Sequence, residues 1–356
     1  MSDDRRVPVR PDLALGEGYH SPQVEVAVRL NTNEAPEPPP AELSARIAEA
    51  VRELPLHRYP DRRATALRQA LADHHGVGAD QVLVGNGSNE VIQAVCLAFG
   101  GPGRVAAVFE PTYALHSHIA RITGTEVAVG ERARDFTLDI DEVRKVWAAT
   151  GAQITFLCSP NNPTGTVEDA ATIAAVVDEA PGLVLVDEAY GQFAPHSALD
   201  LFDGEQPLVV TRTYSKTWAM AALRLGYLIG PAWLVAAAEE VVLPYHVDAL
   251  KQEAGRLALD FLDEMHVRVA AIQEERGRLV VALGELDVDV FPSGANFVLF
   301  RPRSRAGHEV WERLLDHSVL VRDFSSSPRL EGCLRVTVGT RRDDDAFLAA
   351  LQAVLA

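Results

Sequence analysis

The chain contains the stretch Leu208-Val209-Val210-Thr211-Arg212-Thr213-Tyr214-Ser215-Lys216, in which three apolar residues lead into a polar cluster that ends in a lysine. The apolar run 208–210 is typical of a buried strand. Lys216 follows the end of that strand, where a side chain can meet a ligand instead of packing in the core. A lone lysine in such a place is usually a solvated loop residue, so its meaning depends on its neighbours.

Two other apolar runs also end in polar clusters. The run 183–186 leads into Asp187-Glu188-Ala189-Tyr190, and the run 154–158 leads into Ser159-Pro160-Asn161-Asn162-Pro163-Thr164-Gly165. In open α/β sheets, ligands bind outside the carboxyl ends of the strands. The Asn162-Pro163 bond lies in a tight turn and is a candidate for a cis peptide. We therefore expect a single ligand-binding cleft that is shared by Asn162, Asp187, Tyr190 and Lys216.

These residue types suit pyridoxal phosphate. A neutral lysine amine forms a Schiff base with an aldehyde, and burial or nearby positive charge lowers the pKa of such an amine toward neutrality, which makes Lys216 the candidate. An aspartate paired with the pyridine nitrogen lets the ring accept electrons from a substrate carbanion, and Asp187 is placed for this. Asn162 and Tyr190 are neutral donors for the ring's phenolate oxygen. Lys216, Asp187 and Tyr190 are thus the predicted catalytic residues.

The segment 82–92 offers a site for the phosphate of that cofactor. It is predicted to run from a strand through a glycine turn into the start of a helix. Small residues let the backbone approach an anion, and the N–H groups at a helix start favour negative charge. Gly87, Ser88 and Asn89 would form this cup, although such a turn alone most often only reverses the chain. Arg224 could contact the same phosphate together with Ser215.

Eight segments carry a resemblance that covers nearly the whole chain. In order, they are Arg29-Leu30-Asn31-Thr32-Asn33-Glu34, His57-Arg58-Tyr59-Pro60-Asp61, Gly85-Asn86-Gly87-Ser88-Asn89-Glu90, Glu110-Pro111-Thr112-Tyr113, Ser159 to Gly165, Asp187 to Tyr190, Ser215-Lys216, and Cys333-Leu334-Arg335-Val336-Thr337-Val338-Gly339. With them the chain resembles the fold-type I, pyridoxal-phosphate-dependent aminotransferases of the class I/II family, specifically the histidinol-phosphate aminotransferase group. Each segment alone is modest evidence, and the eight in order are strong evidence.

The resemblance implies a role for each site residue. The cofactor ring would be contacted by Tyr113, Asn162, Asp187, Tyr190 and Lys216, and its phosphate by Ser88, Ser215 and Arg224. Tyr59 would reach the phosphate in the neighbouring subunit, which implies a homodimer. Arg335 would bind the anionic group at the α-carbon end of the substrate, which is a phosphate or a carboxylate, because a planar guanidinium matches both. Arg322 would assist it, and Tyr19 with Asn33 would close the pocket.

The implied reaction is transamination between L-histidinol phosphate and 2-oxoglutarate in histidine biosynthesis. Two segments, 35–40 and 217–222, depart from the usual family pattern near the substrate and near the cofactor phosphate. Neither departure removes a group that transamination needs, so an aromatic amino acid aminotransferase is the nearest alternative. A phosphothreonine decarboxylase and a non-catalytic protein that binds pyridoxal phosphate also remain open.

Bulk properties are those of a soluble, cytoplasmic enzyme. The net charge of −17 over 356 residues disfavours partners such as nucleic acids and anionic membranes, which would repel it. We expect no membrane span and no signal peptide, since no long apolar run is present. The three cysteines, Cys96, Cys158 and Cys333, favour a reducing compartment. No cluster of metal-ligand residues at ligand spacing is evident, so we expect no metal.

The pattern along the chain predicts three parts. Residues 1–40 are rich in proline and polar residues and are expected to form an extended arm that packs with the small domain and the substrate site. Residues 41–244 alternate strand and helix patterns, as in a large domain with a mostly parallel sheet covered by helices on both faces. Residues 245–356 combine helical periodicity up to about residue 286 with later strands, as in a smaller α+β domain. The predicted fold class is therefore α/β.

Overall fold

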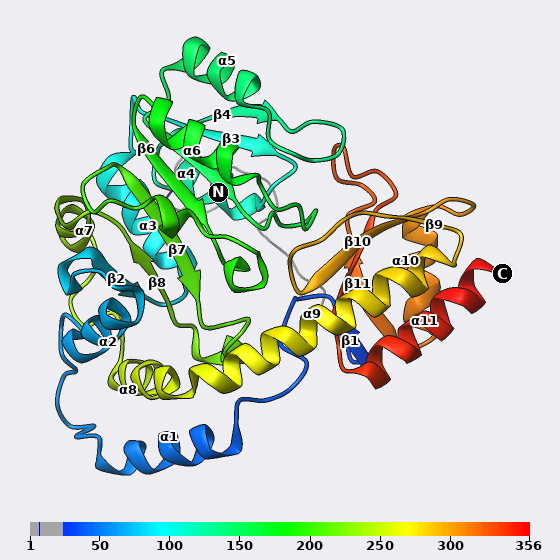
Figure 1. Cartoon of the computed structure of the whole chain (residues 1–356), viewed down its shortest axis with the longest axis horizontal. Coiled ribbons are helices and arrows are strands. Elements are labelled where there is room, and N and C mark those ends of the chain that lie inside the picture. Colours follow the sequence, from blue (N-terminus) through cyan, green and yellow to red (C-terminus); the bar gives the residue numbers. More distant parts are fainter. Residues whose placement is uncertain (1–6, 8–23) are drawn as a thin grey trace, which may run out of the picture.

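A computed structural model of the protein describes residues 7 and 24–356, and it is built around two sheets (Figure 1). The larger sheet has seven strands in the order β2-β8-β7-β6-β5-β3-β4. Only β8 runs antiparallel to its neighbours, so the predicted α/β fold with a mostly parallel sheet is confirmed. The strands are β2 (Val82–Gly85), β3 (Val105–Glu110), β4 (Glu126–Glu131), β5 (Ile154–Cys158), β6 (Leu183–Asp187), β7 (Leu208–Thr213) and β8 (Gly226–Ile229).

Side chains of the large sheet pack into apolar clusters on both faces. On β6, Leu183 and Leu185 join one cluster, while Val184 and Val186 join another. Successive residues of a strand point to opposite faces, so an uninterrupted apolar strand is stable only when helices cover both sides. The helices connected to this sheet are α1 (Ala41–Glu53), α2 (Thr65–His75), α3 (Ser88–Phe99), α4 (Ala114–Ile122), α5 (Ile140–Thr150), α6 (Ala170–Glu179), α7 (Ala232–Glu239) and α8 (Ala249–Ala258).

The smaller sheet has five strands in the order β1-β11-β12-β10-β9. Its first strand comes from the predicted arm and pairs in parallel with β11, so a segment near the start of the chain lies beside one near its end (Figure 1). Two of its strands follow each other closely in the sequence and are separated by a segment that contains Pro292 and Gly294. The strands are β1 (Val28–Leu30), β9 (Val288–Val290), β10 (Phe297–Pro302), β11 (Val319–Asp323) and β12 (Leu334–Thr337), and the helices beside them are α10 (Gly307–Asp316) and α11 (Arg341–Leu355).

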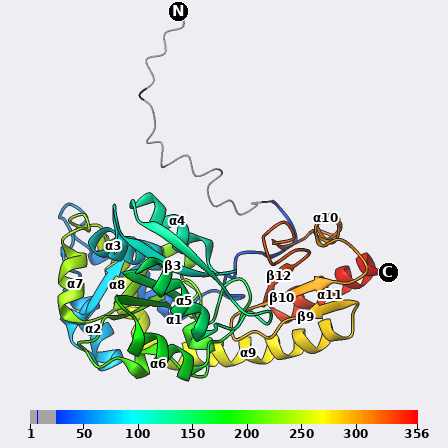
Figure 2. The same cartoon turned by 90° about the horizontal axis from the view of Figure 1, so that it is seen from above.

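The long helix α9 (Leu262–Gly284) runs along one side of the molecule from the large sheet to the small one (Figure 2). The preceding helix, α8, packs against α1 and α2, which places residues 249–258 beside the large sheet. A single apolar cluster joins residues of β2 and β8 to residues of α9, β10 and α11. The predicted boundary between residues 244 and 245 therefore stays a prediction, and the crossing between the two sheets follows α9.

Within residues 7 and 24–356, no helix is long and apolar enough to cross a membrane. Over the same residues, no group of three or more histidine, cysteine, aspartate or glutamate side chains is arranged to hold a metal ion. Cys96, Cys158 and Cys333 are all buried and carry free thiols.

Candidate active site

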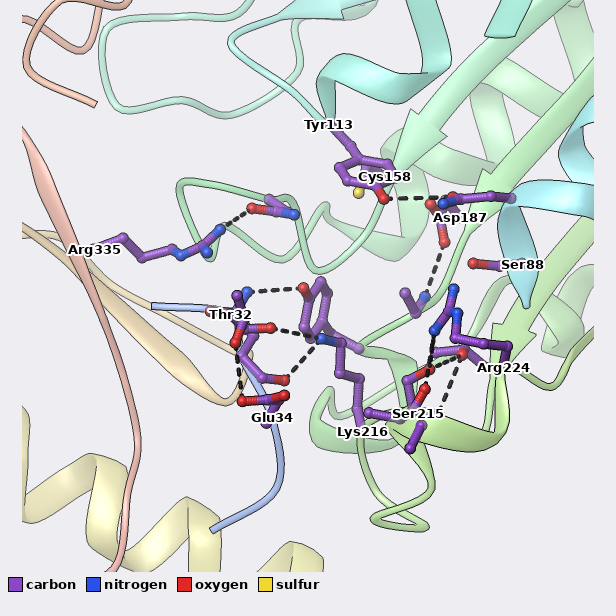
Figure 3. A pocket seen from close by; sticks show the side chains of 18 residues that line it. Thr32, Glu34, Ser88, Tyr113, Cys158, Asp187, Ser215, Lys216, Arg224 and Arg335 are labelled. Atoms are coloured by element: carbon purple, nitrogen blue, oxygen red, sulfur yellow. Dashed lines mark hydrogen bonds between the residues drawn. The ribbon is translucent and has the colours of Figure 1, made fainter. Parts of the chain in front are cut away.

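A cavity of about 360 Å³ lies where the carboxyl ends of the large sheet's strands face the arm and the small sheet (Figure 3). This volume is in the range of small-molecule sites. The structure brings most of the predicted residues to it. The lining residues that the sequence nominated are Asn33, Ser88, Asn89, Tyr113, Asn162, Asp187, Tyr190, Ser215, Lys216, Arg224 and Arg335.

Lys216 lies just beyond β7, and its amine points across the cavity toward the arm (Figure 3). Its Nζ donates hydrogen bonds to the carbonyl oxygens of Thr32 (3.1 Å) and Asn33 (2.8 Å). Burial, followed by the positive charges of Arg335 and Arg224, lowers the pKa of Lys216 to about 7. A large share of this amine is therefore neutral, and so nucleophilic, near neutral pH.

Asp187 ends β6 and is almost completely buried. Its Oδ1 accepts hydrogen bonds from the backbone N–H of Ala189 (3.0 Å) and the hydroxyl of Thr211 (3.2 Å). Its Oδ2 lies 3.0 Å from Nε2 of His116, whose ring stacks on Phe156 at a centroid distance of 5.0 Å. These contacts fix the carboxylate at the cavity wall, where a cationic ring nitrogen could pair with it.

The predicted phosphate cup forms where β2 turns into α3. Gly87 caps the helix with φ +84°, and Ser88 is its first residue. A Cβ at Gly87 would lie 2.8 Å from Nη2 of Arg224, so a larger residue there would shift that guanidinium. Nη1 of Arg224 donates to Oγ of Ser215 (3.2 Å). Helix N–H groups, two hydroxyls and an arginine therefore surround one end of the cavity, a donor set that fits a phosphate.

Tyr190 and Asn162 line the cavity between Asp187 and the arm. The hydroxyl of Tyr190 accepts a hydrogen bond from Nδ2 of Asn33 (2.8 Å), and burial raises the pKa of this phenol, which keeps it neutral. The Asn162-Pro163 bond is cis, as predicted. The amide oxygen of Asn162 accepts a hydrogen bond from Arg335. Both side chains are neutral donors that could stabilise a phenolate without adding a full charge, and both are held by partners from the arm or the small sheet.

Arg335 lies on β12 and is buried, with its guanidinium at the cavity wall. It donates to the carbonyl oxygen of Asn31 (3.0 Å), and its Cζ lies 4.9 Å from the centroid of the Phe297 ring. Arg322 is its partner in the antiparallel pair formed by β11 and β12. Arg322 does not line the cavity. It therefore lies beside Arg335 on the neighbouring strand, away from the cavity wall.

The three other tyrosines predicted for the site differ in their position relative to the cavity. Tyr113 lines the cavity, and its hydroxyl donates to Oδ1 of Asn89 (3.4 Å). Tyr59 lies away from this cavity; its side chain is 81% exposed and stacks on Tyr245 with a centroid distance of 4.7 Å. Its predicted contact with a neighbouring subunit remains a prediction. Tyr19 lies outside the described residues.

Several residues of the site were missed by sequence reasoning. His116 was not nominated from the sequence, yet it contacts Asp187. Its spacing three residues after Tyr113, at the start of α4, is the signal that could have identified it. Glu34 and the carbonyl of Thr32 also line the site. Arg268 of α9 donates to the carbonyl oxygens of Pro38 and Thr217 (2.6 and 3.3 Å), so one side chain joins the two segments that depart from the family pattern.

Comparison with known proteins places this site in a family. Residues 25–351 match the family described as aminotransferase class I and II, and the chain belongs to that family. It is 44% identical over 352 residues to the histidinol-phosphate aminotransferase of Thermobifida fusca, covering 97% of this chain and 95% of the relative. It is 45% identical over 359 residues to the enzyme of that name in Streptomyces avermitilis, covering 97% and 96%.

The fold is also similar to that of a solved structure. The crystal structure of histidinol-phosphate aminotransferase from Sinorhizobium meliloti in complex with pyridoxal-5'-phosphate superposes with a TM-score of 0.86. The match covers 93% of this chain and 91% of that one, at 22% sequence identity. At that identity the similarity concerns the fold alone, and the residues of the cavity carry the argument about chemistry.

Proposed function

We propose that the protein is a pyridoxal-phosphate-dependent aminotransferase that moves an amino group between L-histidinol phosphate and 2-oxoglutarate. The products are imidazole acetol phosphate and L-glutamate, a step of histidine biosynthesis. One observation carries the proposal: a lysine with a pKa of about 7, a buried aspartate and a buried arginine all open onto one cavity. The relatives named for this activity, which span nearly all of the chain, support the choice of substrate.

The described residues fit the cofactor from both ends. When bound, pyridoxal phosphate supplies an aldehyde carbon that takes the amino group and a ring that takes up electrons from the substrate's α-carbon. Ser88, Ser215 and Arg224 lie at the helix start and would hold the phosphate. Asp187 would pair with the pyridine nitrogen, and Asn162 with Tyr190 would donate to the ring oxygen.

Lys216 acts first as an anchor and then as a base. Once the substrate's amino group has displaced it, its Nζ can rest on the carbonyl oxygens of Thr32 and Asn33, which are positioned for hydrogen bonding in the structure. An amine with a pKa of about 7 can take the proton from the substrate's α-carbon at neutral pH and would deliver it to the cofactor carbon that receives the amino group. The donor leaves as an oxo compound before the acceptor binds, so the two substrates use the same cavity in turn.

Arg335 anchors the anionic group of each substrate. Its guanidinium is fixed by Asn31, Asn162 and the Phe297 ring, so little motion has to be frozen when an anion binds. A planar fork of donors matches a phosphate and a carboxylate equally well. This shared anchor lets one cavity accept histidinol phosphate and glutamate alternately.

The enzyme is proposed to work as a cytoplasmic homodimer. The exposed pair Tyr59 and Tyr245 supports a protein contact, because stacked aromatic side chains are enriched at interfaces and costly to leave in water. In the proposed dimer, Tyr59 reaches the cofactor phosphate of the neighbouring subunit. Analytical ultracentrifugation of the wild type and of Tyr59→Ala tests this, and a fully active monomer would contradict it.

The test of function is a single half-reaction. Purified protein loaded with pyridoxal phosphate is mixed with histidinol phosphate or, separately, with phenylalanine, and the absorbance of the bound cofactor is followed. We expect rapid conversion with histidinol phosphate and slow conversion with phenylalanine. Preference for phenylalanine would move the assignment to aromatic amino acids. Release of carbon dioxide in place of an oxo product would identify a decarboxylase.

A further inference from the structure

Phe324, which directly follows β11, contacts both arginines that the sequence nominated for substrate binding. The centroid of its ring lies 5.3 Å from Cζ of Arg335 and 5.6 Å from Cζ of Arg322. Its backbone N–H donates to the carbonyl oxygen of Cys333 (3.0 Å), which ties it to the start of β12. The ring is therefore held in place by the same two strands that carry the arginines.

The two arginines lie opposite each other on neighbouring strands of the small sheet. Arg322 and Arg335 are directly opposed partners of the antiparallel pair between β11 and β12, so their side chains leave the same face. Like charges in that arrangement destabilise the sheet. An aromatic face attracts a guanidinium, and the Phe324 ring meets both. It therefore offsets the repulsion at the site where the two cations come together.

Arg335 is also largely removed from water. Its side chain is buried and lies against the rings of both Phe297 and Phe324. A guanidinium in such a place needs partners to replace its hydration. Two aromatic faces and two hydrogen-bond acceptors, the Asn31 carbonyl and the Asn162 amide, supply them and set the plane of its donors.

We propose that Phe324 is a positioning residue for anion binding: it holds Arg322 behind Arg335 and fixes the plane in which Arg335 meets the substrate's phosphate or carboxylate. The inference rests on the proposed function, in which Arg335 is the shared anchor. It assigns the phenyl ring no contact with the reacting atoms. Loss of the ring therefore weakens the binding of every anionic ligand and leaves the chemical step nearly intact.

The chain provides a matched control. Phe291 is half-buried like Phe324, and both pack against the same apolar cluster of Phe136, Leu299, Leu330 and Cys333. The Phe291 ring also lies beside a guanidinium, 5.7 Å from Cζ of Arg301. Arg301 does not line the cavity. Phe291→Leu therefore removes an equivalent ring and cation contact without touching the proposed anchor.

The experiment compares Phe324→Leu, Phe324→Met, Phe324→Tyr and Phe291→Leu with the wild type, all loaded with pyridoxal phosphate. Four quantities are measured: kcat, KM for each substrate, the inhibition constant of inorganic phosphate, and the midpoint of thermal unfolding. A second readout is calorimetric binding of inorganic phosphate to the same proteins without substrate. We expect Phe324→Leu and Phe324→Met to raise KM and both phosphate constants roughly five- to twentyfold, with little change in kcat.

Phe324→Tyr, which keeps an aromatic face, should restore these constants, and Phe291→Leu should lower the unfolding midpoint while leaving them unchanged. Equal effects of Phe324→Leu and Phe291→Leu on phosphate binding, or no effect of either Phe324 variant, would overturn the inference. The proposed function fails separately: a wild type that does not convert histidinol phosphate loses that assignment. The phosphate constants still decide the role of Phe324 in that case.

Discussion

The two walls of the cavity are built in different ways. The strand-end wall consists of Ser88, Asp187, Ser215, Lys216 and Arg224, which come from the end of β6, the start of α3 and the loop between β7 and β8. The arm wall consists of Thr32, Asn33, Glu34 and Arg335, which belong to the arm and the small sheet. The first wall includes a contact between residues close in sequence, Ser215 with Arg224. The second is joined to the first by contacts between distant segments, such as Lys216 with Asn33.

This difference separates two tasks. In the proposed function, the strand-end wall holds the groups that the cofactor chemistry needs, and parallel strand ends bring them to one edge of the sheet. The arm wall tunes Lys216, because Arg335 lowers the pKa of that amine while Glu34 raises it, and in the proposed function it also supplies the anchor for the substrate's anion. Changes to the strand-end wall should therefore affect turnover and cofactor binding, whereas changes to the arm wall should affect substrate affinity and pH dependence.

The largest effect should come from Lys216→Ala. We expect turnover to fall by at least roughly 10³-fold, because anchor and base are lost together. Cofactor binding should survive in part, since the phosphate cup and Asp187 remain. Steady-state rates and equilibrium dialysis of pyridoxal phosphate measure the two effects. Lys145→Ala is the control, because Lys145 is exposed on α5, where it pairs with Glu142. Near-normal turnover of Lys216→Ala would contradict the proposed mechanism.

Asp187→Asn should have the next largest effect. The amide keeps a similar shape but loses the charge that pairs with the pyridine nitrogen, a contact worth about 1.5–3 kcal/mol, so kcat should fall roughly 10- to 150-fold. Single-turnover absorbance measurements give the rate of the chemical step. Cys158→Ala alters another buried residue of the same cavity and should leave that rate close to normal. Unchanged turnover of Asp187→Asn would remove the proposed role of the carboxylate.

Gly87→Ala tests the cup. The added Cβ would meet Nη2 of Arg224 at 2.8 Å, which displaces the guanidinium and should weaken cofactor binding roughly tenfold or more. The control is Gly76→Ala, since Gly76 also has a positive φ (+69°) but has no atom within 4 Å of a Cβ. Both variants should lose stability in thermal unfolding. Only Gly87→Ala should raise the dissociation constant of pyridoxal phosphate, and equal dissociation constants would argue against the cup.

The smallest expected effect is on the pH dependence of cofactor capture by Lys216. It tests whether Arg335 of the arm wall tunes the pKa of Lys216 in the strand-end wall. With a pKa of about 7, the neutral fraction of Lys216 rises about tenfold per pH unit below 7 and levels off above it. The rate at which unloaded protein captures pyridoxal phosphate should follow the same curve in stopped-flow absorbance. Arg335→Met removes a charge that lowers this pKa, so its curve should shift to higher pH. A wild-type rate that keeps rising well above pH 8 would contradict the prediction.

The residues of the strand-end wall could be predicted from the sequence more fully than the contacts of the arm wall. Lys216 and Asp187 were predictable because an apolar run followed by a polar cluster marks a strand end, and parallel strand ends meet at one edge. The hydrogen bonds from Lys216 to the arm could not be predicted, because they use backbone carbonyls, which any residue type presents. His116 was overlooked because its one signal, a position three residues after Tyr113, does not by itself indicate a contact with Asp187. The crossing between sheets was also unpredictable, since the periodicity of α8 and α9 does not say which sheet each helix packs against.

The edge position of β2 affects how the protein matures during synthesis. β2 pairs only with β8, and Gly226 of β8 approaches so closely that a Cβ there would meet the N–H nitrogen of Ser88 at 2.4 Å. The glycine turn after β2 is synthesised long before β8, the strand that packs against it. In the same way, β1 is synthesised long before its partner strand β11. Non-local pairing of this kind forms slowly and leaves strand edges exposed meanwhile. Pyridoxal phosphate should therefore be captured only by a nearly complete chain, which makes cofactor loading one of the last steps of its folding.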